Sequence, residues 1–332
     1  MPASSRILVV RLGALGDIIF TLPAVASLKH SFPGSRLTWA VEPQWAPLLE
    51  GNPFVDRILP VHRGTPSGLL ATWRTLRAEP YNLAVDFQGL IKSALVAAAA
   101  RTQRIFGFDR AQARESLASV FYSDTARSQS AHMVDKNLDL SAKAGAASAL
   151  RVFPLPPGRA ESILPAGDFV LASPLAGWRS KQWPLEHYRA LARLLRRELG
   201  IPLVLDGPAP ALPILRQVPE AVTHSSSVAG LIYATRRATA VAGVDSGPLH
   251  IAAALGKPGV ALYGPTDPAR NGPYSSSLRV LRASGAATTY RRRNSIDESM
   301  KRLSPDEVFE ALRNVLRERP ETAPAPPDAL VS

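Results

Sequence analysis

Residues 7–17 read ILVVRLGALGD, and this stretch decides the fold. The four apolar residues at 7–10 predict a short strand that is buried on both faces. Gly13 and Gly16 then mark a turn, because glycine tolerates tight backbone geometry and close approach. A helix is expected from about residue 17 to residue 30. A strand, a glycine-containing turn and a helix in this order predict the start of a parallel α/β sheet.

The same alternation continues along the chain. In the first half, further strands are predicted at residues 37–41, 57–61, 82–86 and 104–108, and helices at 67–78, 89–100 and 133–143. The proline-rich residues 151–167 then interrupt the pattern, because proline fixes φ and removes a donor. After them, strands are predicted at 169–172, 203–206, 240–244 and 260–263, and helices at 185–199, 228–236, 248–255 and about 304–319.

This order predicts two doubly wound α/β domains joined by the proline-rich linker, since strand–helix alternation gives parallel sheets with right-handed crossovers. The expected domains are residues 1–155 and 165–319. Residues 320–332 are expected to form a disordered tail. Ligands of such sheets bind at the carboxyl ends of the strands, so the cleft between the domains is the expected site.

The composition excludes several classes of protein. The chain has 332 residues and no cysteine, which excludes a disulfide scaffold and any cysteine-ligated metal site. Its six histidines show no metal-ligand spacing. The net charge of +12 favours anionic partners, with a solvated basic surface as the alternative. No apolar run reaches the ~18 residues of a membrane span, and the N-terminus does not resemble a signal peptide, so a cytoplasmic location is expected.

Asp17 is the candidate general base. It follows the glycine turn and stands at the start of a predicted helix that faces the expected cleft. A carboxylate in that position can accept a proton from a sugar hydroxyl. The alternative is a capping or first-turn acid that the helix dipole stabilises.

A second strand-to-helix junction reads VDSGPLH at residues 244–250. Ser246 and Gly247 leave backbone N–H groups free at a helix start, which suits a diphosphate. His250 either donates to a phosphate or is a satisfied, partly buried histidine. Lys181 can neutralise a leaving phosphate, or is an exposed lysine beside the following Trp-Pro turn. The Thr266 hydroxyl can reach a phosphate or belong to a plain turn.

Basic residues give the first domain a second possible binding surface. Lys92 and Arg114, with other arginines between residues 101 and 110, can receive a phosphorylated or carboxylated acceptor. The alternative is a solvated basic helix. The basic run at residues 291–293 is expected to be surface charge, with contact to a membrane or to nucleic acid as the alternative. A dinucleotide-binding oxidoreductase is disfavoured because the chain lacks GxGxxG.

Five motifs in order along the chain resemble the heptosyltransferases of glycosyltransferase family 9. They are RxGxxGD at residues 11–17 with Pro23, DxQGLxKS at 86–93, KxWP at 181–184, VDSGxxH at 244–250 and YGPTDP at 263–268. The resemblance runs from about residue 7 to residue 316. Within the family, residues 88–93 and 113–118, with His132, are more similar to heptosyltransferase I than to heptosyltransferase II.

The resemblance implies a GT-B fold and an inverting, metal-independent transfer of heptose from ADP-heptose to the Kdo of Kdo-lipid A. It makes Asp17 the base and Lys181 the phosphate-binding lysine. It implies that the second domain binds the donor through Gly177, Asp245, Ser246, Gly247, Leu249, His250 and Thr266. It implies that the first domain binds the acceptor through Arg11, Gly13, Gln88, Lys92, Arg114 and His132. No cofactor and no nucleic acid are implied, and the expected location is the cytoplasmic face of the inner membrane, by peripheral contact with its anionic surface.

Three segments depart from the family pattern. One of them, residues 290–293, keeps a basic run but lacks the cysteines that many relatives carry around it. An acidic residue that holds the nucleoside after the second strand of the donor domain has no counterpart here except Asp206. Threonines before KxWP are replaced by Ala176 and Gly177. A family relative with another acceptor or nucleotide sugar, such as heptosyltransferase II or a surface-glycan transferase, is therefore one alternative. A non-catalytic polyanion-binding module is another.

Overall fold

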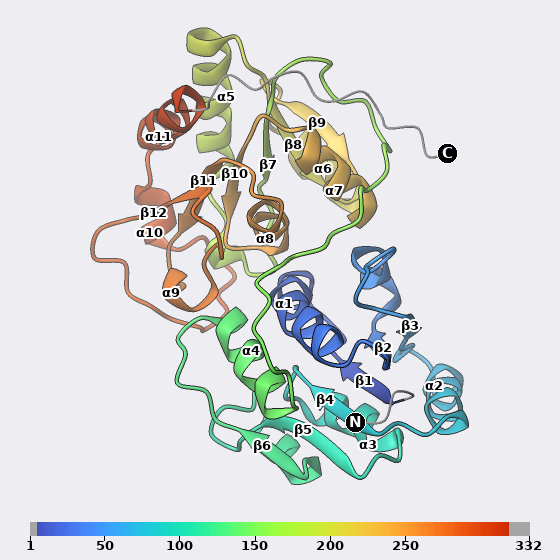
Figure 1. Cartoon of the computed structure of the whole chain (residues 1–332). Helices are drawn as coiled ribbons and strands as arrows, with labels where there is room; N and C mark the ends of the chain where they lie inside the picture. Colours follow the sequence, from blue (N-terminus) through green and yellow to red (C-terminus); the bar gives the residue numbers. More distant parts are fainter. Residues whose placement is uncertain (1–4, 319–332) are drawn as a thin grey trace.

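The computed structural model describes residues 5–318, and the tail expected at residues 320–332 lies outside them. Two halves stack one above the other, and each is built on a parallel sheet (Figure 1). The chain passes from the first sheet to the second once, through residues 144–169, which contain neither helix nor strand. The α/β fold of two doubly wound domains is therefore confirmed.

The first half contains a six-stranded sheet in the order β3-β2-β1-β4-β5-β6, and all of its neighbouring strands are parallel. With η for a short 3₁₀ helix, its elements are β1 Arg6–Val10, α1 Leu15–Ser31, β2 Arg36–Val41, η1 Pro43–Leu48, β3 Arg57–Pro60, α2 Pro66–Ala78, β4 Leu83–Asp86, α3 Ile91–Ala99, β5 Arg104–Phe108, η2 Ser116–Phe121, β6 Asp124–Ala126 and α4 Met133–Lys143.

The second half repeats this plan with the strand order β12-β11-β10-β7-β8-β9, again fully parallel. Its elements are β7 Val170–Ser173, η3 Arg179–Lys181, α5 Leu185–Leu199, β8 Leu203–Gly207, η4 Ala209–Ala211, α6 Leu212–Leu215, β9 Val222–Ser225, α7 Val228–Arg237, β10 Ala240–Val244, α8 Gly247–Ala254, β11 Gly259–Tyr263, α9 Pro268–Asn271, β12 Leu278–Arg282, α10 Glu298–Arg302 and α11 Pro305–Arg317.

Helices cover both faces of the first sheet, which explains the continuous apolar run in β1. Ile7 and Val9 face one cluster, which also contains residues of α1, and Leu8 and Val10 face the other. All four side chains are fully buried. A strand with a helix layer on each side has no solvent-facing residues, so its sequence shows no polar alternation.

The strands that sequence reasoning missed are β6, β9 and β12, and each lies at the edge of a sheet. Edge strands are buried less completely than central strands, so their sequences are more polar and their pattern is weaker. Leu278–Arg282, for example, reads LRVLR and leaves its second and third residues exposed. The remaining predicted strands and the long predicted helices are confirmed, with ends that shift by a few residues.

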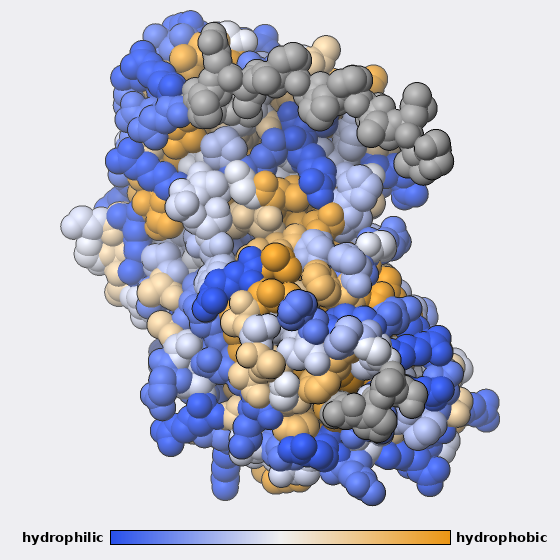
Figure 2. All heavy atoms as spheres, in the orientation of Figure 1, coloured by the Kyte–Doolittle hydropathy of each residue, from blue (hydrophilic) through white to orange (hydrophobic). Residues whose placement is uncertain are grey.

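The two halves meet through helix N-termini and apolar side chains. α1 packs on α8, and η1 packs on α7. One buried hydrophobic cluster includes residues of both sheets, and Figure 2 shows hydrophobic groups gathered where the halves meet. The approach is close, because a Cβ on Gly16 would lie 2.6 Å from Cδ2 of His250. Likewise, a Cβ on Gly247 would lie 2.7 Å from Cδ2 of Leu15.

A polar contact joins the halves beside this packing. Asp135 of α4 accepts a hydrogen bond from the Tyr274 hydroxyl at 2.6 Å, and Arg151 donates to the same hydroxyl at 2.9 Å. The contact ties the end of the first half to the loop after α9. None of the helices between residues 5 and 318 combines the length and apolarity that a bilayer span requires.

Candidate active site

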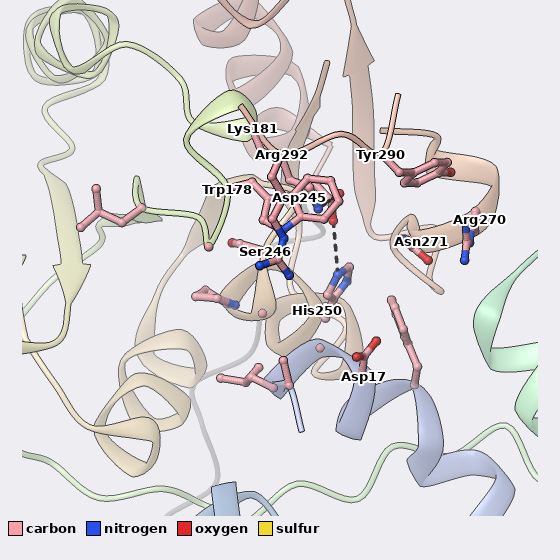
Figure 3. A pocket seen from close by; sticks show the side chains of 18 of the residues that line it. Asp17, Trp178, Lys181, Asp245, Ser246, His250, Arg270, Asn271, Tyr290 and Arg292 are labelled. Carbon is pink, nitrogen blue, oxygen red and sulfur yellow. Dashed lines mark hydrogen bonds and ion pairs between the residues drawn. The ribbon is translucent and has the colours of Figure 1, made fainter. Parts of the chain in front are cut away.

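A cleft of about 690 Å³ lies between the two halves. The start of α1 forms one wall, and the start of α8 with the loop before η3 forms the other (Figure 3). Both walls are strand-to-helix junctions, so the carboxyl ends of the two sheets face each other as the alternation predicts. The predicted residues that line this cleft are Asp17, Arg114, Gly177, Lys181, Asp245, Ser246, Gly247 and His250.

Asp17 projects from the first turn of α1 into the cleft, and two arginines hold it. Nη2 of Arg11 lies 2.9 Å from Oδ2 of Asp17, and Nη2 of Arg114 lies 3.0 Å from the same oxygen. Arg11 is fully buried and also donates to the carbonyl oxygen of Phe87. Arg114 is about half exposed. Arg11 is therefore fixed in the interior, whereas Arg114 is accessible to a ligand in the cleft.

The charge of Asp17 follows from these neighbours. Burial acts to raise the pKa of its carboxyl group, because a low dielectric disfavours the charged form. Arg11 and Arg114 outweigh burial, and the pKa lies below its ordinary value. Asp17 is therefore an ionised carboxylate at neutral pH. It is able to accept a proton, and the two guanidinium groups lower its basicity.

On the opposite wall, Asp245 directly follows β10 and forms contacts with the polar groups around it. Its Oδ2 accepts hydrogen bonds from Lys181 Nζ at 2.7 Å and from the Thr266 hydroxyl at 2.6 Å. Nε2 of His250 lies 3.6 Å from the other oxygen. Burial acts to raise the pKa of Asp245, but His250 and Lys181 lower it well below its ordinary value. The carboxylate therefore fixes Lys181 in the cleft, where the ammonium also lies 4.5 Å from the ring of Trp178.

The start of α8 offers unpartnered polar groups to the cleft. Ser246 occupies the N-cap position, and its side chain makes no capping hydrogen bond. Within the described residues, the Ser246 hydroxyl and Nδ1 of His250 are buried without a hydrogen-bond partner. Gly247 and Pro248 open the helix, so its first N–H groups have no acceptor within the helix. A helix N-terminus of this kind suits an anion.

The cleft also contains residues that sequence reasoning missed. They are chiefly aromatic and cationic, namely Phe20, Trp45, Trp178, Arg270, Asn271, Tyr290 and Arg292. Arg292 had been expected as surface charge, and it is exposed at the rim of the cleft, where its guanidinium lies 5.4 Å from the centre of the Trp178 ring. Arg270 lies 4.8 Å from the ring of Tyr290. These aromatic and cationic residues follow no periodic pattern in the sequence that would have indicated their place in the cleft.

Comparisons with known proteins agree with this geometry. The model of glycosyltransferase family 9 (heptosyltransferase) matches residues 69–300. The chain belongs to glycosyltransferase family 9. It is similar to lipopolysaccharide heptosyltransferase 1 of Escherichia coli strain K12, with 30% identity over 84% of this chain and 93% of that protein. Its identity to lipopolysaccharide heptosyltransferase 1 of Pseudomonas aeruginosa is 33%, over 82% of each chain.

A solved structure of a family 9 member supports the same assignment. The structure of the E. coli heptosyltransferase WaaC with ADP superposes with a TM-score of 0.75 and 27% sequence identity. The match covers 93% of this chain and 99% of that chain. The two parallel sheets described here are therefore the GT-B architecture of a family 9 glycosyltransferase, as the resemblance implied.

Several residues that the family 9 resemblance singled out lie outside the cleft lining. Leu249 is fully buried and packs beside Gly243. Thr266 is buried and acts on the site through Asp245. Gly13 lies against Trp45, since a Cβ there would be 2.8 Å from Nε1 of the indole. These three residues support the walls of the cleft, and direct contact with a ligand stays a prediction for each.

Three of the acceptor-side predictions are also absent from the lining of the cleft. Gln88 is buried, and its Oε1 accepts a hydrogen bond from the Leu12 N–H at 2.7 Å. His132 accepts from the Val134 N–H through Nδ1, and its Nε2 lies 3.0 Å from the carbonyl oxygen of Gly272. Lys92 is exposed on α3. Their roles in acceptor binding therefore stay predictions, and Gln88 and His132 already hold neighbouring segments together.

Asp206, which the family 9 pattern left as the only acid for the nucleoside, does not line the cleft. It is buried and accepts hydrogen bonds from His224 and from the Ser226 hydroxyl, each at 2.7 Å. The search for metal sites found no group of three potential ligand side chains within residues 5–318. The positive charges that the cleft presents to a ligand come from lysine and arginine side chains and from the start of α8.

Proposed function

We propose that this family 9 enzyme transfers heptose from ADP-heptose to the Kdo of Kdo-lipid A in lipopolysaccharide inner-core synthesis. One observation carries the proposal. A first-turn carboxylate, Asp17, lines the same cleft as Lys181 and the open N-terminus of α8 (Figure 3). A base on one wall and an anion site on the other are what a displacement at an anomeric carbon needs. The relatives at 30–33% identity bear the name lipopolysaccharide heptosyltransferase 1.

In this proposal the second half, residues 165–319, binds the nucleotide sugar. The diphosphate accepts hydrogen bonds from the N–H groups that open α8 and from the Ser246 hydroxyl, which has no other partner among the described residues. Lys181 contributes a positive charge, and its ammonium keeps donors beyond the one it gives to Asp245. Arg270 and Arg292 lie along the same wall and add to the positive field. No metal cofactor is required, because these groups neutralise the leaving ADP.

The proposed reaction is a single displacement with inversion. The acceptor hydroxyl oxygen attacks the anomeric carbon of heptose, and its proton passes to a carboxylate oxygen of Asp17. The bond between the anomeric carbon and the phosphate oxygen breaks, and its electron pair stays on ADP. Lys181 and the α8 N-terminus stabilise the negative charge that develops there. The step balances without a covalent enzyme intermediate.

The first half, residues 1–155, binds the acceptor in this proposal. Kdo carries a carboxylate, and the half-exposed Arg114 is the cation beside Asp17 that a second carboxylate reaches first. When Arg114 is shared, the pKa of Asp17 rises toward its ordinary value and the carboxylate becomes a better base. Binding of an acidic acceptor therefore prepares the base. We also propose that the enzyme works in the cytoplasm, at the inner membrane, because its acceptor is anchored there.

The test is ADP release from ADP-heptose with heptose-free Kdo-lipid A. We expect acceptor-dependent release by the wild type and a loss of about 10²–10⁴-fold in turnover for Asp17→Asn, with donor affinity retained. Asp306→Asn is the matched control, since Asp306 is a first-turn acid of α11 outside the cleft. Equal losses in both variants would mean that Asp17 only stabilises its helix. Near-normal turnover of Asp17→Asn would remove it as the base.

A second candidate is transfer from a different nucleotide sugar, and the burial of Asp206 against His224 is the observation that favours it. With Asp206 occupied, the acid that holds the nucleoside in relatives has no counterpart in the cleft lining. Thermal stabilisation by ADP, UDP and GDP in parallel separates the candidates, because a bound ligand raises the melting temperature. Stabilisation by ADP alone supports the ADP-sugar, and a larger shift with UDP or GDP moves the donor to that nucleotide.

A further inference from the structure

The elements α2, α3 and η2 form an outer layer on one face of the first sheet. Their inward side chains pack into a cluster with β1 and β4, through Leu76 of α2, Ala94 and Ala97 of α3, and Ala118 of η2. In Figure 1 this layer belongs to the lower half, away from α5 and α11. The proposed chemistry takes place at the cleft between the halves and gives the outward side of this layer no role.

The outward side of the layer is unusually apolar. Among the described residues, eleven large hydrophobic side chains are exposed, and six of them lie on these three elements. Scattered single residues of this kind are ordinary on a protein surface, but a group of them on one layer marks an interaction site. We call this group the apolar face; its members are Leu69, Leu70, Trp73, Leu95, Leu117 and Val120.

The charge around the apolar face has one sign. The sequences of α2, α3 and η2 contain no Asp or Glu. Their charged residues are Arg74, Arg77 and Lys92, and the Arg77 guanidinium lies 4.2 Å from the centre of the Trp73 ring. Arg63 precedes α2 and is also exposed, but it already forms an ion pair with Glu42. An anionic partner therefore meets cations and apolar groups on the same surface.

The carboxylates that flank the layer are already occupied. Glu79 follows α2 and lies 3.2 Å from Arg6 and 3.8 Å from Arg57. Glu115 precedes η2, and its Oε2 accepts a hydrogen bond from the Ile91 N–H at 2.7 Å. Glu79 is therefore paired with cations outside the three elements, whereas Glu115 keeps its negative charge close enough to Lys92 to favour the charged ammonium.

The apolar face also borders the acceptor side of the cleft. Arg114, which binds Asp17, lies two residues before η2 begins. Lys92 has a lowered pKa, first through partial burial and then through repulsion from Arg63 and Arg114. The start of α3 is also tied to the segment that carries Arg114, because Glu115 accepts a hydrogen bond from the Ile91 N–H and α3 packs on η2. The layer is therefore continuous with the wall that carries Asp17.

We propose that the apolar face is a docking surface for an anionic lipid bilayer. Leu and Trp side chains insert among the acyl chains while Arg and Lys remain at the headgroups, as in interfacial helices. Cations without any acid within the three elements complement the negative surface of an anionic headgroup layer. The inference rests on the proposed function in one respect, since it explains how a lipid-anchored acceptor reaches Asp17.

The first test is cosedimentation of the full chain with vesicles of phosphatidylglycerol and phosphatidylcholine, or of phosphatidylcholine alone. We expect the wild type to prefer the anionic vesicles, and Leu69→Ser/Trp73→Ser to lose about tenfold or more in partitioning. Ile163→Ser/Val280→Ser is the matched control, because it removes two exposed apolar side chains of similar type elsewhere. It should bind as the wild type does. No anionic preference in the wild type, or equal binding by all three proteins, overturns the proposal.

Charge reversal provides an independent arm. Arg74→Glu/Arg77→Glu should lower partitioning into anionic vesicles by about tenfold or more at low salt. Arg196→Glu/Arg279→Glu makes the same change in net charge at exposed positions of the second half and should have a much smaller effect. If both pairs weaken binding equally, net charge alone attracts the protein and the docking surface is wrong.

An activity comparison separates this inference from the proposed function. Leu69→Ser/Trp73→Ser should retain wild-type turnover on a deacylated, soluble Kdo acceptor, because neither residue lines the cleft. On the same acceptor with its acyl chains in vesicles, turnover should fall together with vesicle binding. If the wild type is inactive on both acceptors while it still binds vesicles through the apolar face, the proposed function fails and the docking surface stands. Equal turnover of variant and wild type on vesicles rejects the docking role.

Discussion

Substitution of Gly16 by alanine tests whether the close approach of α1 and α8 sets the catalytic geometry. The new Cβ would lie 2.6 Å from Cδ2 of His250, whereas carbon atoms in contact lie about 3.5–4.0 Å apart. Something must therefore move by about 1 Å. The imidazole has little freedom, because it is buried, lies 4.4 Å from the Phe20 ring and is 3.6 Å from Asp245.

The displacement is expected at the neighbouring Asp17, which follows Gly16 directly. A shift of about 1 Å in a reacting group lowers turnover by about 10²-fold. The fold itself should tolerate the change, since alanine is favoured over glycine in a helix by about 0.5–1 kcal/mol. We therefore expect a large loss of acceptor-dependent ADP release with little change in the melting temperature.

Two further variants make this test decisive. Gly167→Ala is the control, because a Cβ there has no neighbour within 4 Å, and it should behave like the wild type. In a His250→Ala background the steric conflict is gone, so Gly16→Ala should then have little additional effect on turnover. If Gly16→Ala costs as much in that background as in the wild type, or costs nothing in either, the argument from helix approach is wrong.

Three further predictions concern the charged groups. Arg114→Ala removes a guanidinium and should therefore raise the pKa of Asp17. In a pH profile of kcat/KM between about pH 4 and 8, the acidic limb should move to higher pH. An unchanged acidic limb would contradict the ion pair between Arg114 and Asp17. Lys181→Ala should weaken ADP binding in calorimetry and lower turnover by about 10²-fold, and unchanged values of both would exclude a phosphate role. Tyr122→Phe removes the 2.8 Å hydrogen bond that the hydroxyl donates to the buried Asp86. It should lower the free energy of unfolding in urea by about 1–3 kcal/mol and leave turnover unchanged. An unchanged midpoint of unfolding would show that the Asp86 carboxylate is satisfied without this bond.

The fold could be predicted from the sequence where burial is strongest. The central strand β1 is apolar at four consecutive positions and buried at all of them, so its pattern leaves little choice. The edge strands β6, β9 and β12 were missed, because half-covered strands carry polar residues that read as loop. The spatial relation of the halves was predicted only in outline, through the rule that parallel sheets bind ligands at their carboxyl ends.

The candidate site was predictable where a motif places a side chain at a helix start, as for Asp17 and Ser246. Motif spacing could not separate residues that face the cleft from residues that hold it together. Thr266 and Gln88 belong to motifs, yet the Thr266 hydroxyl donates to Asp245 and the Gln88 carbonyl accepts from a backbone N–H. Arg292 illustrates the opposite limit, because a run of arginines in an irregular segment has no periodicity to show which exposed one borders the cleft.

The single passage of the chain between the halves has a consequence for how such enzymes diversify. All strands of the first sheet lie before residue 127, and all strands of the second lie after residue 169. One recombination event in the intervening DNA would therefore exchange a whole half without cutting either sheet. A chimaera made in this way would still have to match Gly16 with His250 and Gly247 with Leu15. Compatibility between halves from different parents would thus be decided by these small surfaces, whereas substrate choice would travel with each parental half.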